Sequence, residues 1–277
     1  MKNLISLLNE FIGVGGYKRE PEGFLSWQHL LFVGSLLTIM TVLAIVIGLG
    51  NRSKDEKVKN LPLIYAAILI DGFEILKILS LCYRSESPEP ILYNLPLFLC
   101  SVQLIAIPLA AFSKGSVRSA AIDFVCLFGI LGAVFGTIGA GQNYGCYPVL
   151  SLDNVVSGIT HSISGFASLY IMIAKLTNLT PKNIKNTSLI LFSFCIMAYI
   201  ANITLDYNYM FLMAGDGTPY DIFYDLVNGN QILYPLIVVF LFVIYIVAFY
   251  FVCTIIKKKK QNSEIKDEEQ KDFANVK

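Results

Sequence analysis

Charged residues are scarce in this sequence. Asp, Glu, Lys and Arg make up 15% of the 277 residues, whereas a soluble domain usually carries about 25%. Hydrophobic residues make up 55%, and the mean hydropathy is +0.63. This composition excludes an ordinary soluble domain. We expect one membrane-embedded domain, with membrane lipids as its partners and no nucleic acid among them.

The sequence also lacks the spacings of a metal site. It contains two histidines and six scattered cysteines, with no CxxC or Cys/His pair of the zinc-binding type. Cys82 and Cys146 would both lie near the outer face, where a disulfide is feasible, although spacing alone does not decide the pairing. Four acidic residues of the outer loops lack EF-hand spacing, and we expect them to be solvated rather than calcium-binding. They are Asp153, Asp216, Asp221 and Asp225.

Long apolar runs dominate what is present. A helix needs about 20 apolar residues to cross the hydrocarbon core, and seven stretches of that length are separated by polar breaks. The sequence therefore predicts an all-α, polytopic membrane protein with seven transmembrane helices. The expected spans are 27–49, 61–81, 91–112, 120–141, 154–176, 187–209 and 231–256.

Basic residues fall mainly on one side of these spans. Under the positive-inside rule that side is cytoplasmic, which places the N-terminus outside and the C-terminus in the cytoplasm of a multi-pass cell-membrane protein. The expected cytoplasmic side holds Arg52, Lys54, Lys57, Lys59, Lys114, Arg118, Lys175, Lys182, Lys185 and the run from Lys257 to Lys260. The expected outer side holds only Lys2, Lys18, Arg19 and Arg84.

Two flanking segments complete the expected organisation around the transmembrane domain of residues 27–256. Residues 1–26 carry Leu and Ile at helical spacing up to Ile12, which predicts a short helix in the outer interface, ended by Gly13 to Gly16. Residues 257–277 are charged, and we expect a disordered tail. In the fourth span, glycines at 129, 132, 136 and 139 form a small-residue stripe that favours close helix packing.

Several polar side chains fall inside the expected spans, where each is costly unless it is paired or faces a cavity. Asp71, Glu74 and Lys77 recur every three residues on one side of the second span. A purely structural explanation is that they form ion pairs that hold the bundle together. At about 1.5 Å rise per residue, Glu74 and Asn202 lie about 10 Å from the outer surface. Lys77 and Asp206 are shallower, so these groups could line one polar chamber.

Cys100 and His161 fall at a similar depth. The same count places Cys100 about 13 Å and His161 about 10 Å below the outer surface. Alone, the cysteine is most simply a small apolar residue, and the histidine a donor to a backbone carbonyl. Together they match the requirement of covalent catalysis for a thiol whose proton a neighbouring base removes. Glu74 or Asp206 would then orient the imidazole.

The LPLFLCS segment of the third span, the membrane histidine of the fifth and the NYMFL segment from Asn208 to Leu212 resemble the YwaF-like family of integral membrane proteins. The resemblance covers most of the membrane domain. Vertebrate relatives of that family act as phospholipid acyltransferases, and the resemblance implies a nucleophilic role for Cys100 and a base role for His161. One position departs from the family pattern, which tends to read Leu-Pro-Leu-His-Leu-Cys, because this chain carries Phe98 in place of that histidine.

Two hypotheses for function follow. The first is a lipid acyltransferase that uses Cys100 and His161 and needs no soluble cofactor, since the acyl donor is itself a lipid. Ser101 or Gln103 could stabilise the oxyanion, although such residues on helices more often form interhelical hydrogen bonds. The second is a transporter or substrate-binding membrane component for a polar small molecule. The residues expected to bind or orient the substrate are Glu74, Lys77, Asn202, Asp206 and Asn208.

Overall fold

The computed structural model describes residues 2–139, 141–177 and 179–275, and the side chains of residues 5–259 apart from the two gaps. Within these residues all regular secondary structure is helical, and there are no strands. The elements are α1 Lys2–Ile12, α2 Trp27–Asn51, α3 Glu56–Ser85, α4 Pro90–Tyr93, α5 Gln103–Phe112, α6 Gly115–Thr137, α7 Gly141–Cys146, α8 Leu152–Ile173, η1 Pro181–Asn183, α9 Ile184–Leu205, η2 Tyr209–Phe211, α10 Asp221–Leu226 and α11 Leu233–Asn275.

Five helical stretches are long and apolar enough to cross a membrane. They are Trp27–Asn51, Gly115–Cys146, Leu152–Ile173, Pro181–Leu205 and Leu233–Lys259. Two of the seven expected spans do not meet that standard. Helix α3 is long enough but carries Asp71, Glu74 and Lys77 within its apolar run, and α5 has only 10 residues.

The expected third span, residues 91–112, is not one helix. The chain forms α4, leaves helical geometry after Tyr93, and becomes helical again at Gln103. Pro96 explains the break, because it lacks a backbone N–H and disfavours helical geometry in Leu95. Cys100 therefore lies in a turn, and a depth counted along a continuous helix does not apply to it.

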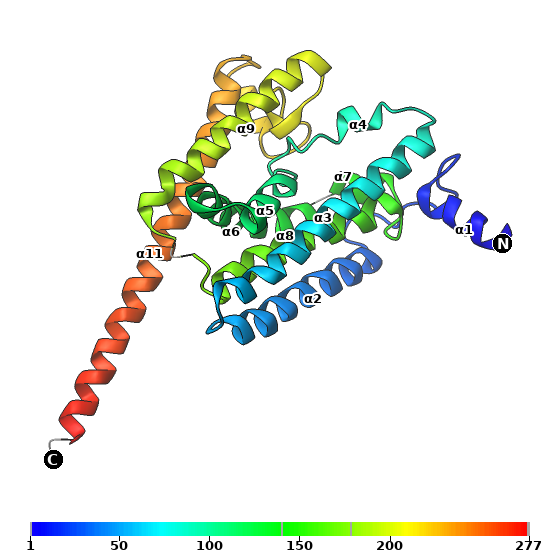
Figure 1. The fold of residues 1–277 in the computed structure, drawn as a ribbon. Coiled ribbons are helices and arrows are strands. Elements are labelled where there is room, and N and C mark those ends of the chain that lie inside the picture. Colours follow the sequence, from blue (N-terminus) through cyan, green and yellow to red (C-terminus); the bar gives the residue numbers. More distant parts are fainter. Residues whose placement is uncertain (1, 140, 178, 276–277) are drawn as a thin grey trace.

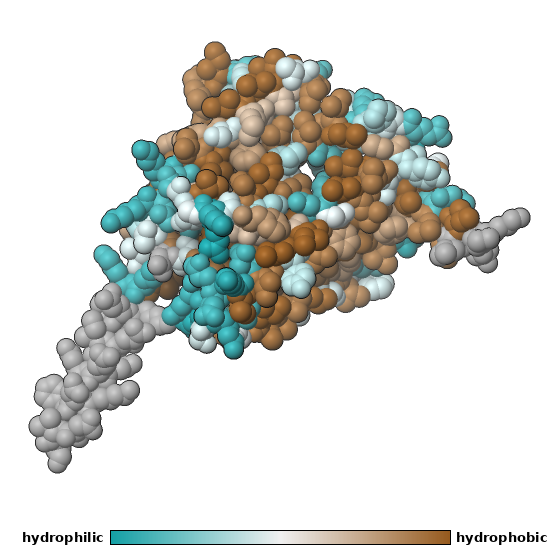
Figure 2. Space-filling model, viewed as in Figure 1, coloured by the Kyte–Doolittle hydropathy of each residue, from teal (hydrophilic) through white to brown (hydrophobic). Residues whose placement is uncertain are grey.

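The helices form a bundle with an apolar exterior. Figure 1 shows α2, α3 and α8 running side by side, with α9 and α11 as a second pair, and these neighbours are in contact. Apolar side chains cover much of the face in Figure 2, and hydrophilic ones gather toward its edges. Large apolar residues are exposed along the outer helices, among them Leu31 of α2, Ile196 of α9 and Phe251 of α11. Such a surface suits contact with lipid rather than water.

Helices α6 and α8 pack closely along the glycine stripe, which confirms its expected packing role. A Cβ atom at Gly129 would lie 2.5 Å from the carbonyl oxygen of Ser164, so only glycine fits there. Ser168 of α8 donates a hydrogen bond of 2.6 Å to the carbonyl of Cys126 on α6. Close contact between these two helices fixes the position of everything that α8 carries.

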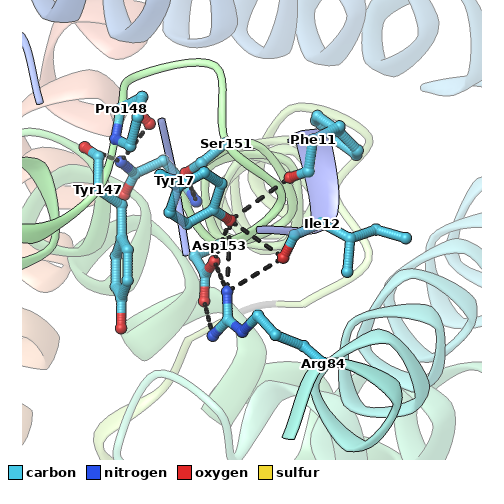
Figure 3. Close-up of polar contacts among 9 residues, drawn as sticks. Phe11, Ile12, Tyr17, Arg84, Tyr147, Pro148, Ser151 and Asp153 are labelled. Atoms are coloured by element: carbon cyan, nitrogen blue, oxygen red, sulfur yellow. Dashed lines mark hydrogen bonds and ion pairs between the residues drawn. The ribbon is translucent and has the colours of Figure 1, made fainter. Parts of the chain in front are cut away.

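The N-terminal segment forms the expected helix, and a polar cluster ties its end to the bundle (Figure 3). Arg84 pairs with both carboxylate oxygens of Asp153, at 2.7 and 3.2 Å, and donates to the carbonyl of Ile12 at 3.2 Å. Tyr17 donates to Asp153 at 2.6 Å; burial and this hydrogen bond raise the pKa of the phenol. The expectation that Asp153 is solvated is therefore wrong, because the side chain is paired with Arg84.

The last helix of the structure is α11. The backbone of α11 is helical to Asn275, beyond the bundle (Figure 1). Glu, Lys and Gln are good helix formers, and a helix that already exists extends without a new nucleation step. All six cysteines are free, including Cys82 and Cys146.

Candidate functional site

Cys100 lies in the turn that leads into α5. Ser101 shapes this turn, because its Oγ accepts from the backbone N–H of Phe98 at 3.0 Å and donates to the Phe98 carbonyl at 3.1 Å. The N–H of Gln103 donates to the carbonyl of Cys100 at 3.3 Å, which starts the helix. The thiol is half-buried.

His161 lies on α8 and is held by its own helix. Its Nδ1 is 2.7 Å from the carbonyl oxygen of Ser157, and the Ser157 hydroxyl lies 3.4 Å from the same nitrogen. A carbonyl only accepts hydrogen bonds, so this contact assigns the proton of a neutral imidazole to Nδ1. The other nitrogen, Nε2, then carries the lone pair. The ring is therefore ready to accept a proton at Nε2.

The side chains of Cys100 and His161 are close enough to act on each other electrostatically. Helix α6 lines this pair with glycine. A Cβ atom at Gly132 would come within 3.4 Å of the Cys100 Cβ atom, and one at Gly136 would overlap the Cδ2–Nε2 edge of His161. The arrangement places a thiol near an imidazole with a defined tautomer, and the glycines of α6 leave space for both.

The two segments that carry the family resemblance also lie together. Phe98, two residues before Cys100, packs its ring against Tyr209 at 5.2 Å, Phe211 at 6.0 Å and Tyr207 at 6.3 Å. Tyr209 in addition donates its hydroxyl proton to the carbonyl of Leu92. Phe98, where the YwaF pattern has histidine, thus belongs to an aromatic cluster that joins the turn before α5 to the loop after α9.

Comparison with known proteins places these segments in one family. The model of the TMEM164 family matches residues 24–253, which contain α2 to α10 and most of the apolar part of α11. The chain belongs to the TMEM164 family. It is therefore a multi-pass helical membrane protein. No curated protein and no solved structure matched the chain.

In this TMEM164-family chain, Glu74 and Lys77 lie near the Cys100–His161 pair but do not orient the imidazole. Lys77 Nζ is 2.6 Å from Glu74 Oε1, and both side chains are mostly buried. The ammonium of Lys77 is close enough to His161 to act on it electrostatically. The orienting group is the Ser157 carbonyl, not Glu74 or Asp206 as the sequence suggested.

Three other expected substrate-binding residues build the loop after α9 instead. Asn202 holds both backbone groups of Tyr209, accepting from its N–H at 2.6 Å and donating to its carbonyl at 3.0 Å. Asp206 ends α9 in left-handed geometry, with φ of +51°. Asn208 donates to Asp216 at 2.6 Å and to the carbonyl of Ala214 at 2.8 Å. Within the part of the chain described, no hydrogen bond or ion pair joins these residues to Glu74 or Lys77.

Sequence reasoning missed two residues that shape the site. Ser157 precedes His161 by four residues, and that spacing places its carbonyl one helical turn below the imidazole. Gly136 belongs to the recognised stripe, yet only the rotation of α6 shows that it faces His161. The spacing of Ser157 and His161 could be read from the sequence, but the rotation of α6 that turns Gly136 toward His161 could not.

Proposed function

We propose that this protein is a membrane lipid acyltransferase that moves an acyl chain from a phospholipid to a lysophospholipid. The observation that carries the proposal is that the Cys100 thiol lies near an imidazole whose Nδ1 is fixed on a carbonyl. That is the arrangement by which a thiol becomes a nucleophile, because the base takes the proton as the sulfur attacks. Both residues are only partly buried, as access for a lipid from the bilayer requires.

The reaction balances with these two residues alone. Cys100 gives its proton to His161 Nε2, and the thiolate attacks the ester carbonyl carbon of the donor phospholipid. The tetrahedral intermediate collapses, the carbon–oxygen bond to glycerol breaks, and His161 returns the proton to the departing lysophospholipid alkoxide. The acyl chain is then a thioester on Cys100. In the second half, a new lysophospholipid hydroxyl gives its proton to His161 and attacks the thioester, which releases the thiol.

Lys77 supports a phospholipid substrate. An ammonium beside the reacting pair suits the phosphate of a headgroup, which is a strong hydrogen-bond acceptor. Glu74 holds this ammonium in place at 2.6 Å while no lipid is bound. We assign Lys77 and Glu74 to substrate binding, and we assign Asn202, Asp206 and Asn208 to positioning the aromatic cluster around Phe98.

We further propose seven crossings, with the N-terminus outside and the lysine-rich end of α11 in the cytoplasm of the cell. Helix α3 has 30 residues, or about 45 Å of rise, and Glu74 is buried and paired rather than facing lipid. Residues 90–112, the third segment along the chain, supply the remaining crossing and bring the total to seven. Irregular backbone is tolerated at membrane depth when protein covers it, and Val102 and Gln103 are fully buried.

The transporter hypothesis loses its main support. It required Glu74, Lys77, Asn202 and Asp206 to converge on one polar solute, but Asn202 is saturated by the backbone of Tyr209 and Asp206 ends a helix.

The direct test is acyl exchange by the purified protein in vesicles that contain a phospholipid with a labelled acyl chain and an unlabelled lysophospholipid. Wild type is expected to produce labelled product, and Cys100→Ala protein none above background. Circular dichroism and the elution volume in detergent serve as controls for folding. Equal exchange by folded Cys100→Ala protein would refute the proposed nucleophile.

A further inference from the structure

Gln103 has a buried side-chain amide without a partner. The residue is 0% exposed, and neither its Nε2 nor its Oε1 forms a hydrogen bond. Buried polar groups are nearly always hydrogen-bonded, since each one gives up its bonds to water. The sequence offered two explanations for this residue, an interhelical hydrogen bond or a role at the reacting carbonyl. The first is not observed.

The turn geometry aligns Gln103 with Cys100. Three successive backbone hydrogen bonds here join residues three apart. The N–H donates to the carbonyl from Gln103 to Cys100 at 3.3 Å, from Leu104 to Ser101 at 3.0 Å and from Ile105 to Val102 at 3.0 Å. In such a tight turn the side chains of residues three apart lie one above the other. Helical side chains also lean toward the N-terminus of their helix. From this geometry we expect the side chain of Gln103 to lie on the same side of the turn as that of Cys100.

The neighbours of Gln103 strengthen this placement. Gln103 lies on the buried face of α5 together with Ala106, Ile107 and Ala110, and α5 packs against α6. Helix α6 also carries Gly132, which faces Cys100. The other candidate, Ser101, is already committed, because its hydroxyl forms both of its bonds with the backbone of Phe98.

We propose that Gln103 is a catalytic residue whose Nε2–H group donates to the acyl carbonyl oxygen during transfer, which rests on the acyltransferase function proposed above. When the Cys100 thiolate attacks the carbonyl carbon, the π electron pair moves onto that oxygen and its negative charge grows. A donor already in place and shielded from water stabilises this charge without reorganisation. The pair returns to the carbon–oxygen bond when glycerol leaves, so that Gln103 is unchanged by the reaction.

The test uses Gln103→Leu and Gln103→Glu in the full-length protein, each compared with wild type in two reactions. The first is acyl exchange in phosphatidylcholine vesicles with lysophosphatidylcholine. The second is alkylation of Cys100 by iodoacetamide, followed on the Cys100 peptide by mass spectrometry; it needs the thiolate but forms no oxyanion. Both variants are expected to lose on the order of 100-fold in acyl exchange. The rate of Cys100 alkylation is expected to stay within about two-fold in the leucine variant, because the thiol and His161 are untouched.

Thermal stability separates this role from a structural one. Leucine removes an unpartnered buried amide, so the unfolding midpoint of Gln103→Leu is expected to equal or exceed that of wild type. A lower midpoint together with slower alkylation would show that Gln103 only supports the fold, and full acyl exchange in both variants would remove it from the reaction. Wild type without Cys100-dependent exchange would overturn the acyltransferase proposal and this one together. Cys100-dependent exchange that survives in both Gln103 variants would overturn this one alone.

Discussion

Replacing His161 by alanine is expected to lower acyl exchange on the order of 1,000-fold, because a positioned general base contributes roughly 100- to 10,000-fold to catalysis. His161 is the histidine near the Cys100 thiol, and its Nδ1 is fixed on the Ser157 carbonyl at 2.7 Å. Without Nε2 the thiol keeps its proton. Alkylation of Cys100 by iodoacetamide at neutral pH is therefore expected to slow in parallel, measured on the Cys100 peptide.

Gly136→Ala displaces the same imidazole without removing it. The added Cβ would overlap the Cδ2–Nε2 edge of His161, so the ring must leave its place near Cys100. Misplacement of a reacting group by about 1 Å can cost on the order of 100-fold. The matched control is Gly34→Ala on α2, where a Cβ meets no atom within 4 Å, and exchange is expected to be unchanged. Normal exchange in folded Gly136→Ala and His161→Ala proteins would contradict the role of His161.

Asp123→Ala is expected to lower the free energy of unfolding by about 3 kcal/mol, because it removes the shared acceptor of the buried Tyr250 hydroxyl and of the partly buried Thr177 and Asn183 side chains. The Asp123 carboxylate on α6 is fully buried. It accepts from Tyr250 of α11 at 3.0 Å, and from Thr177 and Asn183 in the connection between α8 and α9. The substitution would remove a carboxylate that joins α6, α11 and the connection between α8 and α9.

The measurement is unfolding of the purified protein in mixed micelles by increasing amounts of a denaturing detergent. The control is Asp225→Ala, in which an exposed carboxylate is removed, and a change within about 0.5 kcal/mol is expected. Equal stability of the two variants would contradict the structural role of Asp123. Below its unfolding midpoint, Asp123→Ala protein is expected to keep acyl exchange, because the residue lies outside the Cys100–His161 pair.

The hydrophobic pattern predicted most helices well, and local chemistry explains where it did not. The spans expected at 27–49 and 154–176 correspond to α2 and α8. The start of each helix is fixed by a serine cap, Ser26 or Ser151, whose side chain accepts a hydrogen bond from a backbone N–H. The third span failed because hydropathy averages over Pro96, which breaks the helix. The failure matters for function, since the break places Cys100 in a turn at the start of α5.

The candidate site was predicted in part. Cys100 and His161 were paired by a depth count that assumed a continuous helix; in the structure they lie close enough to interact electrostatically, and their catalytic roles stay a prediction. Asn202 and Asn208 were grouped with them because a polar residue near a helix end can line a cavity or hold a loop, and the sequence does not distinguish the two. In the structure their amides hold the loop. Similarly, the orientation of Gly136 toward His161 depends on how α6 is rotated, which is decided by packing between distant segments.

The acyl-enzyme itself gives the most direct test of the central claim. Purified wild-type protein would be mixed with labelled phospholipid donor in the absence of a lysophospholipid acceptor, quenched in acid, digested and examined by mass spectrometry. The proposed reaction predicts one acyl chain on the Cys100 peptide, removed by neutral hydroxylamine as a thioester should be, and transferred when lysophospholipid is added before the quench. An acyl chain on a different residue, or exchange at the full rate while Cys100 stays unmodified, would contradict it.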